Sequence, residues 1–150
     1  YDCVPVAEVE ELTDKEYVPD CCTPLYDAMG LSLNHLRAKV NDEDKVLVTI
    51  ITDGEENSST EYNSAAIKAL VDSLKEKGWV FAYIGANQDV LKVAQTISVT
   101  NVMNFSSTDF GTTSAIASLR KSRDRMFSRI ADGVFDSVSE NTDFFSEDEE

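Results

Sequence analysis

The chain has 150 residues and a mass of 16.6 kDa, which suits one compact domain. Its 42% hydrophobic content is enough to bury a core, so wholesale disorder is excluded. The 13 Lys plus Arg residues against 28 Asp plus Glu give a formal charge of -15. This charge argues against binding to nucleic acid or to an anionic membrane surface. No apolar run approaches the roughly 20 residues that span a bilayer, and the acidic N-terminus has no signal-peptide pattern.

The first half of the chain predicts an amphipathic helix followed by a buried strand. Thr23 is the expected N-cap of the helix, with Pro24 at its first position. The helix's apolar face recurs at spacings of three and four, at Leu25, Met29, Leu33, Leu36 and Val40. After the polar loop NDED, the run KVLVTIIT is typical of a strand that is buried on both faces.

The second half repeats this alternation of helices and strands. We expect a helix over about residues 61–77, ended by Gly78, and a fully apolar strand at WVFAYI. A short helix from about Val90 and a weaker strand at 101–105 follow. The last predicted helix spans about residues 112–130, and its expected inner face is Ile116, Leu119, Met126 or Phe127, and Ile130.

The charge along the chain separates an acidic end from a basic helix. Residues 134–150 carry seven acidic residues and no basic one, whereas residues 111–133 carry five basic residues. We expect 134–150 to be a disordered, solvated tail, because its charge density opposes collapse. A tail that folds back onto the basic helix is the alternative. Residues 1–133 would then form the single folded domain.

The cysteine content bears on the cellular compartment. Cys3, Cys21 and Cys22 make an odd count, and two of the three are adjacent. Neighbouring cysteines rarely bridge each other without strain, and one thiol would always remain unpaired. Reduced thiols in a cytoplasmic protein are the simpler interpretation.

Alternating strands and helices predict an α/β fold: a doubly wound, mostly parallel, Rossmann-like sheet flanked by helices. Ligands of such sheets bind beyond the carboxyl ends of the strands. Three loops are therefore candidate site loops, at 53–60, 85–89 and 106–111. The sharpest feature is TIITDGEEN, in which Asp53 follows a buried strand directly and Gly54 permits a tight turn. Hard oxygen ligands of this kind suit Mg²⁺, Ca²⁺ or Mn²⁺, although an ordinary Asp-Gly turn explains the pattern as well.

The ordered pair TPLYDAMG and KVLVTIITDGEEN resembles the von Willebrand factor A domain in its bacterial form. The metal-ion-dependent adhesion site of that family combines a DxSxS loop after the first strand, a Thr, and an Asp in a strand-TDG segment. Thr23 matches the second part and Asp53 the third. The helix after Asp53, the strand WVFAYIG and the GANQD loop are also similar, so the resemblance covers roughly residues 1–130.

The DxSxS motif itself does not occur in these 150 residues. The comparison with the family implies an N-terminal truncation: we expect YDCVPVAEV to correspond to the third strand, with the elements before it missing. A fragment of a longer product is the favoured explanation, with a complementing chain or a remodelled domain as the others. A sheet that lacks these strands has an unpaired edge, for which dimerisation or strand swapping is expected.

The resemblance implies a protein-binding module rather than an enzyme. Thr23 and Asp53 would bind a divalent cation, Mg²⁺ or Ca²⁺ or Mn²⁺, once the DxSxS loop is supplied, and no cofactor is expected otherwise. The cation would take a carboxylate from a partner protein, with Glu55 and Glu56 at the rim of the site. A metal-independent interaction scaffold is the main alternative. A Mg²⁺-dependent phosphoryl-transfer or hydrolytic enzyme is less favoured, because no Gly-rich GK[ST] loop, nucleophile elbow or convincing base occurs.

Overall fold

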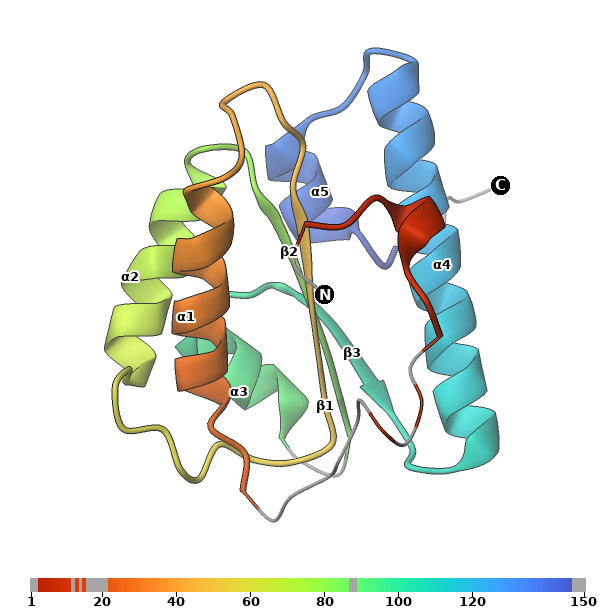
Figure 1. The fold of residues 1–150 in the computed structure, drawn as a ribbon. Helices are drawn as coiled ribbons and strands as arrows, with labels where there is room; N and C mark the ends of the chain where they lie inside the picture. The colour runs from red at the N-terminus through yellow and green to blue at the C-terminus, as the bar shows by residue number, and fades with distance from the viewer. Residues whose placement is uncertain (1–2, 12, 14, 16–21, 87–88, 147–150) are drawn as a thin grey trace.

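The structure is a computed structural model that describes residues 3–11, 13, 15, 22–86 and 89–146. The chain alternates helices and strands, as predicted (Figure 1). In chain order the elements are the 3₁₀ helix η1 (Val6–Glu8), α1 (Leu25–Arg37), β1 (Leu47–Thr52), α2 (Ser64–Lys75), β2 (Val80–Ala86), α3 (Val90–Thr96), β3 (Asn101–Phe105), α4 (Asp109–Ala131) and α5 (Ser137–Asp143).

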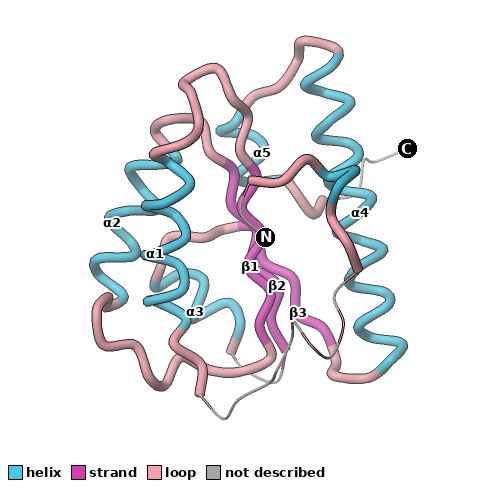
Figure 2. Tube along the Cα trace, viewed as in Figure 1, coloured by secondary structure: helices cyan, strands magenta, loops and turns pink. Residues whose placement is uncertain are grey.

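The three strands form one parallel sheet in the order β1-β2-β3 (Figure 2). Every residue of the central strand β2 is buried, which explains why its sequence is an unbroken apolar run. Helices cover both faces of the sheet: α1, α2 and α3 lie on one side, and α4 and α5 on the other (Figure 1). The prediction of a Rossmann-like α/β fold with a parallel sheet flanked by helices is confirmed. The strand order of the described residues runs in one direction, without a reversal.

Two apolar clusters hold these layers together. The larger one packs α1, α2 and α3 against the sheet around Ile67, Val71, Phe81 and Tyr83. The smaller one, on the other face, joins α4 and the segment after α5 to β2 through Val80, Ala82, Met126 and Phe144. Gly78 ends the α2 region with a φ of +84°, a conformation that favours glycine, as its position after Lys77 predicted. No helix in the described part of the chain is long and apolar enough to cross a membrane.

The prediction of a disordered tail is wrong for residues 134–146, which contain a capped helix and a buried aromatic side chain. Asp136 caps the helix α5 by accepting hydrogen bonds from Val138 and Ser139 N–H. Phe144 beyond the helix is completely buried. Arg129 of α4 pairs with Glu140, and Arg125 donates to the carbonyls of Phe144 and Ser146. The acidic end therefore folds back onto the basic helix, because α4 neutralises its charge and the aromatic side chain supplies the burial. Residues 147–150 lie outside the described part.

Two further expectations need correction. Residues 3–9 form no strand; they are exposed and contain only η1, since Pro5 lacks an N–H and no apolar side chain there is buried. On α4, the buried positions are Ala115, Ser122 and Met126. Ile116, which was expected on the inner face, is 49% exposed. Of the alternatives Met126 and Phe127, Met126 is buried and Phe127 is 51% exposed. The apolar stripe of α4 is thus wider than the surface that the sheet covers.

Candidate functional site

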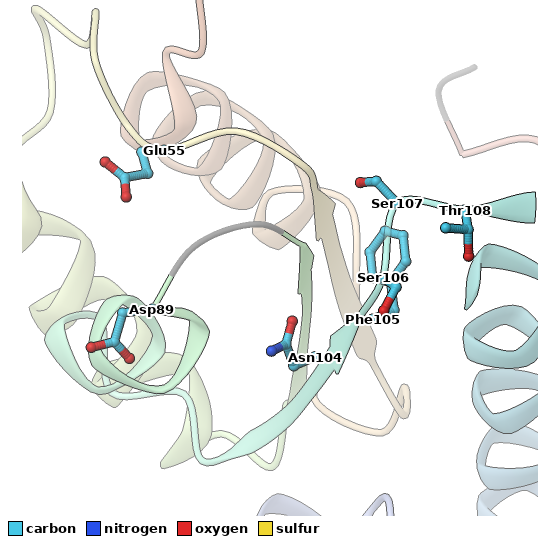
Figure 3. A pocket seen from close by; sticks show the side chains of 7 residues that line it. All are labelled: Glu55, Asp89, Asn104, Phe105, Ser106, Ser107 and Thr108. Atoms are coloured by element: carbon cyan, nitrogen blue, oxygen red, sulfur yellow. The ribbon is translucent and has the colours of Figure 1, made fainter.

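The three loops that follow the strands lie together at the carboxyl edge of the sheet, as predicted. They border an open hollow of about 740 Å³ lined by Glu55, Asp89, Asn104, Phe105, Ser106, Ser107 and Thr108. Figure 3 shows Glu55 and Asp89 on one side of this hollow and the hydroxyl side chains that follow β3 on the other. Residues 87 and 88 of the middle loop lie outside the described residues. Carboxylates and hydroxyls make this edge polar and acidic.

Asp53 lies at a neighbouring hollow of about 430 Å³, between the end of β1 and the start of α4. Two carboxylate residues and four hydroxyl residues border the same space: Asp53, Asp109, Thr52, Ser107, Thr108 and Thr112. Asp53 is exposed. The Thr52 hydroxyl donates to the Gly54 carbonyl and accepts from the Gly54 N–H, and these bonds fix the turn that presents Asp53.

Thr23 lies against this turn. A Cβ on Gly54 would approach the Thr23 Oγ1 to 2.7 Å, so only glycine permits this approach. Thr23 N–H donates to the Asn57 Oδ1 at 2.8 Å, and the Thr23 carbonyl accepts from Asn57 N–H at 3.2 Å. The structure thus brings the Thr23 side chain beside the residue that follows Asp53. Thr23 therefore contacts the residue after Asp53, but it does not line the hollow that Asp53 borders.

The expected capping role of Thr23 is wrong. The residue before α1 is Pro24, and no side chain of that position caps the helix. The N–H groups of the first turn are satisfied across space instead: Tyr26 N–H donates to Glu56 Oε2 and to Ser59 Oγ, and Asp27 N–H donates to Ser59 Oγ. The loop after β1 therefore caps α1.

Glu56, expected at a partner-binding rim, uses both carboxylate oxygens inside the molecule. Oε1 accepts from Ser58 and Ser59 N–H, and Oε2 accepts from Tyr26 N–H and the Ser59 hydroxyl. Burial alone would raise the pKa of Glu56, but the hydrogen bonds from Ser59, Tyr26 and Ser58 outweigh it and lower the pKa. The geometry gives Glu56 a structural role, whereas Glu55 is exposed beside the hollow.

Asp27 makes a similar set of contacts, for which the sequence analysis predicted no role. Its carboxylate accepts hydrogen bonds from the N–H groups of Thr60, Glu61 and Tyr62. The bond from Thr60 N–H is the main reason that the pKa of Asp27 is lowered. Asp27 and Glu56 thus tie α1 and the 54–62 loop to each other in both directions. The only local signal was the position of Asp27 in the first turn of α1, where acidic residues are favoured.

Replacing Glu56 with Gln tests whether its carboxylate stabilises the contact between α1 and the 54–62 loop. An amide nitrogen accepts no hydrogen bond, so at least two donors lose their partner, and we expect a loss of about 1–2 kcal/mol in the free energy of unfolding at pH 7. Because the folded-state pKa of Glu56 is lowered from its ordinary value of 4.5, its contribution is complete above that value and is lost as the pH falls through the folded pKa. Urea unfolding between pH 7 and pH 3 should show the difference between wild type and Glu56→Gln shrinking below about pH 4.5. A difference in unfolding free energy that stayed constant from pH 7 to pH 3 would contradict this role of the Glu56 carboxylate.

No family model, curated protein or solved structure matches this chain.

Proposed function

We propose that this chain is a protein-binding module of the von Willebrand factor A type, whose carboxyl edge holds a divalent cation between its own oxygens and those of a partner. The observation that supports the proposal is the contact of Thr23 with Gly54, the residue after Asp53. In the sequence Thr23 and Asp53 lie 30 positions apart, and the hydrogen bonds of Asn57, Glu56 and Asp27 hold their segments together. A hydroxyl and a carboxylate at one sheet edge are ligands that Mg²⁺ accepts.

The donor set fits such a cation in kind but not in number. Among the described residues no group of three His, Cys, Asp or Glu side chains could hold a metal ion. Thr23 and Asp53 supply two oxygens, whereas Mg²⁺ takes six ligands and Ca²⁺ six to eight. In the proposal the others come from water, from a complementing DxSxS segment and from an acidic side chain of the partner, with Glu55 at the rim. The chain alone is therefore expected to bind the cation weakly.

The small number of protein ligands for a cation favours a second candidate function, an interaction scaffold that needs no metal. A site with two protein ligands gives little affinity, while the carboxyl edge still offers open hollows of about 740 and 430 Å³ for a partner. That the chain is a binding module rather than an enzyme, and that it is cytoplasmic, stay predictions from the sequence.

Paramagnetic Mn²⁺ is the probe that separates the two candidates. We expect substoichiometric Mn²⁺ to broaden the amide NMR signals of Thr23, Asp53 and Gly54 first, with an apparent Kd of about a millimolar. Asp53→Asn should remove this selective broadening. Glu61→Gln, which removes the same charge from an exposed position in the described chain, should keep it. Broadening that is spread evenly over the acidic surface, or is unchanged in Asp53→Asn, would overturn the cation proposal and favour the scaffold.

A further inference from the structure

The outer edge of β1 is unpaired in the described part of the chain. Among the described residues β1 pairs with β2 alone. Val80 N–H donates to the Val46 carbonyl, so Val46 and every second residue after it turn their backbone groups toward β2. The intervening residues Leu47, Thr49 and Ile51 therefore direct their N–H and C=O groups away from the sheet. This edge is a row of backbone donors and acceptors that an extended chain can use.

Nothing in β1 protects this edge from pairing. The strand LVTIIT has no charged residue and no proline, and three of its six residues are Ile or Val. Ile51 is 54% exposed. Edge strands in proteins are ordinarily blocked by charges, proline, bulges or a covering segment. The described residues 3–11 pass across this side in Figure 1 but contain no strand, and Val6 among them is 91% exposed. They leave the edge unpaired.

Helix α4 extends the apolar surface beside the edge. At 100° per residue, Ile116 and Phe127 lie on one flank of α4, opposite the flank from which Arg125 and Arg129 reach α5. Leu47 of β1 packs against the same apolar cluster as Leu119 and Ile130 of α4. Leu119 and Ile130 lie between the buried face of α4 and the flank with Ile116 and Phe127, so this flank is the one turned toward the β1 side. Both side chains are about half exposed. A strand added to β1 would bury them together with Ile51.

Charge decides what kind of strand fits. Two copies of β1 that paired about a two-fold axis would run antiparallel. This arrangement would set the stretch with Glu43, Asp44 and Lys45 of one copy near Asp53 and Glu55 of the other. Carboxylates would then outnumber the single lysine at both ends of the new pair. Like charges that face each other across an interface disfavour pairing, and the whole chain already carries a charge of -15. An apolar strand with basic ends meets the opposite conditions.

We propose that the outer edge of β1 binds an extended segment of a partner polypeptide, adding it to the sheet as a strand. The segment is uncharged and rich in β-branched residues at its centre and carries Lys or Arg at both ends. Its backbone pairs with Leu47, Thr49 and Ile51, and alternate side chains pack on Ile116 and Phe127. This binding does not depend on the cation proposed above.

The test uses a fluorescein-labelled peptide, Lys-Lys-Val-Thr-Val-Thr-Val-Thr-Lys-Lys, and fluorescence anisotropy. Wild type should bind it, and a peptide with Asp in place of every Lys should bind at least about tenfold more weakly. Ile51→Lys should weaken binding by a similar factor, because it places a charge on the edge. Leu91→Lys, an equal change of charge at a side chain 61% exposed on α3, should bind like wild type.

Hydrogen exchange of the wild type gives a second readout that needs no variant. The amides of Leu47, Thr49 and Ile51 should exchange faster than those of Val48 and Ile50, and the peptide should slow all three. The proposal would be overturned if the peptide did not bind, if Ile51→Lys bound it as well as the wild type does, or if the peptide left the exchange of these three amides unchanged. Sedimentation of wild type as a dimer that Ile51→Lys dissociates would assign the edge to a second copy and overturn it as well.

Discussion

A chain truncated after Gly133 is expected to be unfolded at room temperature. The truncation removes Phe144, whose side chain is completely buried against Val80, Ala82 and Met126. Loss of one buried Phe side chain costs about 3–5 kcal/mol. The buried Asn141 goes with it; this side chain accepts from Phe81 N–H and donates to the Trp79 carbonyl, so two buried backbone groups lose their partners. Each such group costs about 1–3 kcal/mol, and the sum approaches the whole stability of a typical domain, about 5–15 kcal/mol.

The matched control is a chain that ends at Ser146. It loses four acidic residues beyond the described part but keeps α5, Phe144 and the bonds from Arg125. Circular dichroism and thermal melting should show this control folded, with a transition close to that of the full chain. A chain ending at Gly133 that melted within a few degrees of the full chain would show that α5 is dispensable, as a solvated tail would be.

The strands were predictable because burial of a strand on both faces requires a continuous apolar segment, which can be recognised in the sequence. β2 is buried on both faces, so its residues are all apolar, and Gly78 before it needs a positive φ. The predicted strands at 45–52, 79–84 and 101–105 accordingly match the observed ones within two residues. The sequence of helix α5 indicates its burial much less clearly. Its acidic residues suggested a solvated tail, and the groups that make burial possible, Arg125 and Arg129, lie more than ten residues away on α4.

The candidate site was predictable in its location but not in its internal contacts. Asp53 follows a strand, and Thr23 precedes a helix; their common corner follows from the parallel sheet. The functions of Glu56 and Asp27 depend on backbone N–H groups about 30 residues away. Such side-chain-to-backbone bonds require no particular residue type at the donor, so the sequence contains no pattern that identifies them. Glu55 and Glu56 look alike in the sequence, yet only Glu56 is turned inward.

Arg129→Ala is expected to destabilise the fold strongly. Arg129 Nη1 donates to Glu140 Oε1 at 2.9 Å, and the Glu140 side chain is only 2% exposed. Removing the arginine leaves a carboxylate buried without its counter-charge, for which losses of about 3–5 kcal/mol are typical. Because the Arg129 side chain is itself 43% exposed, water can partly replace it, and we expect the lower end of that range, about 3 kcal/mol, in urea unfolding at pH 7.

The double variant Arg129→Ala with Glu140→Gln separates this cause from a simple loss of packing. A neutral amide at position 140 needs no counter-charge, so the second substitution should restore part of the stability that the first removes, and the two effects should be strongly non-additive. Arg123→Ala is the control, since Arg123 is an exposed arginine on the same helix that pairs with Asp124 at 3.4 Å; it should cost less than about 1 kcal/mol. Additive effects, or an Arg129→Ala loss as small as that of Arg123→Ala, would mean that water reaches Glu140. The fold-back of the acidic end onto α4 would then depend on Phe144 and Asn141 rather than on charge.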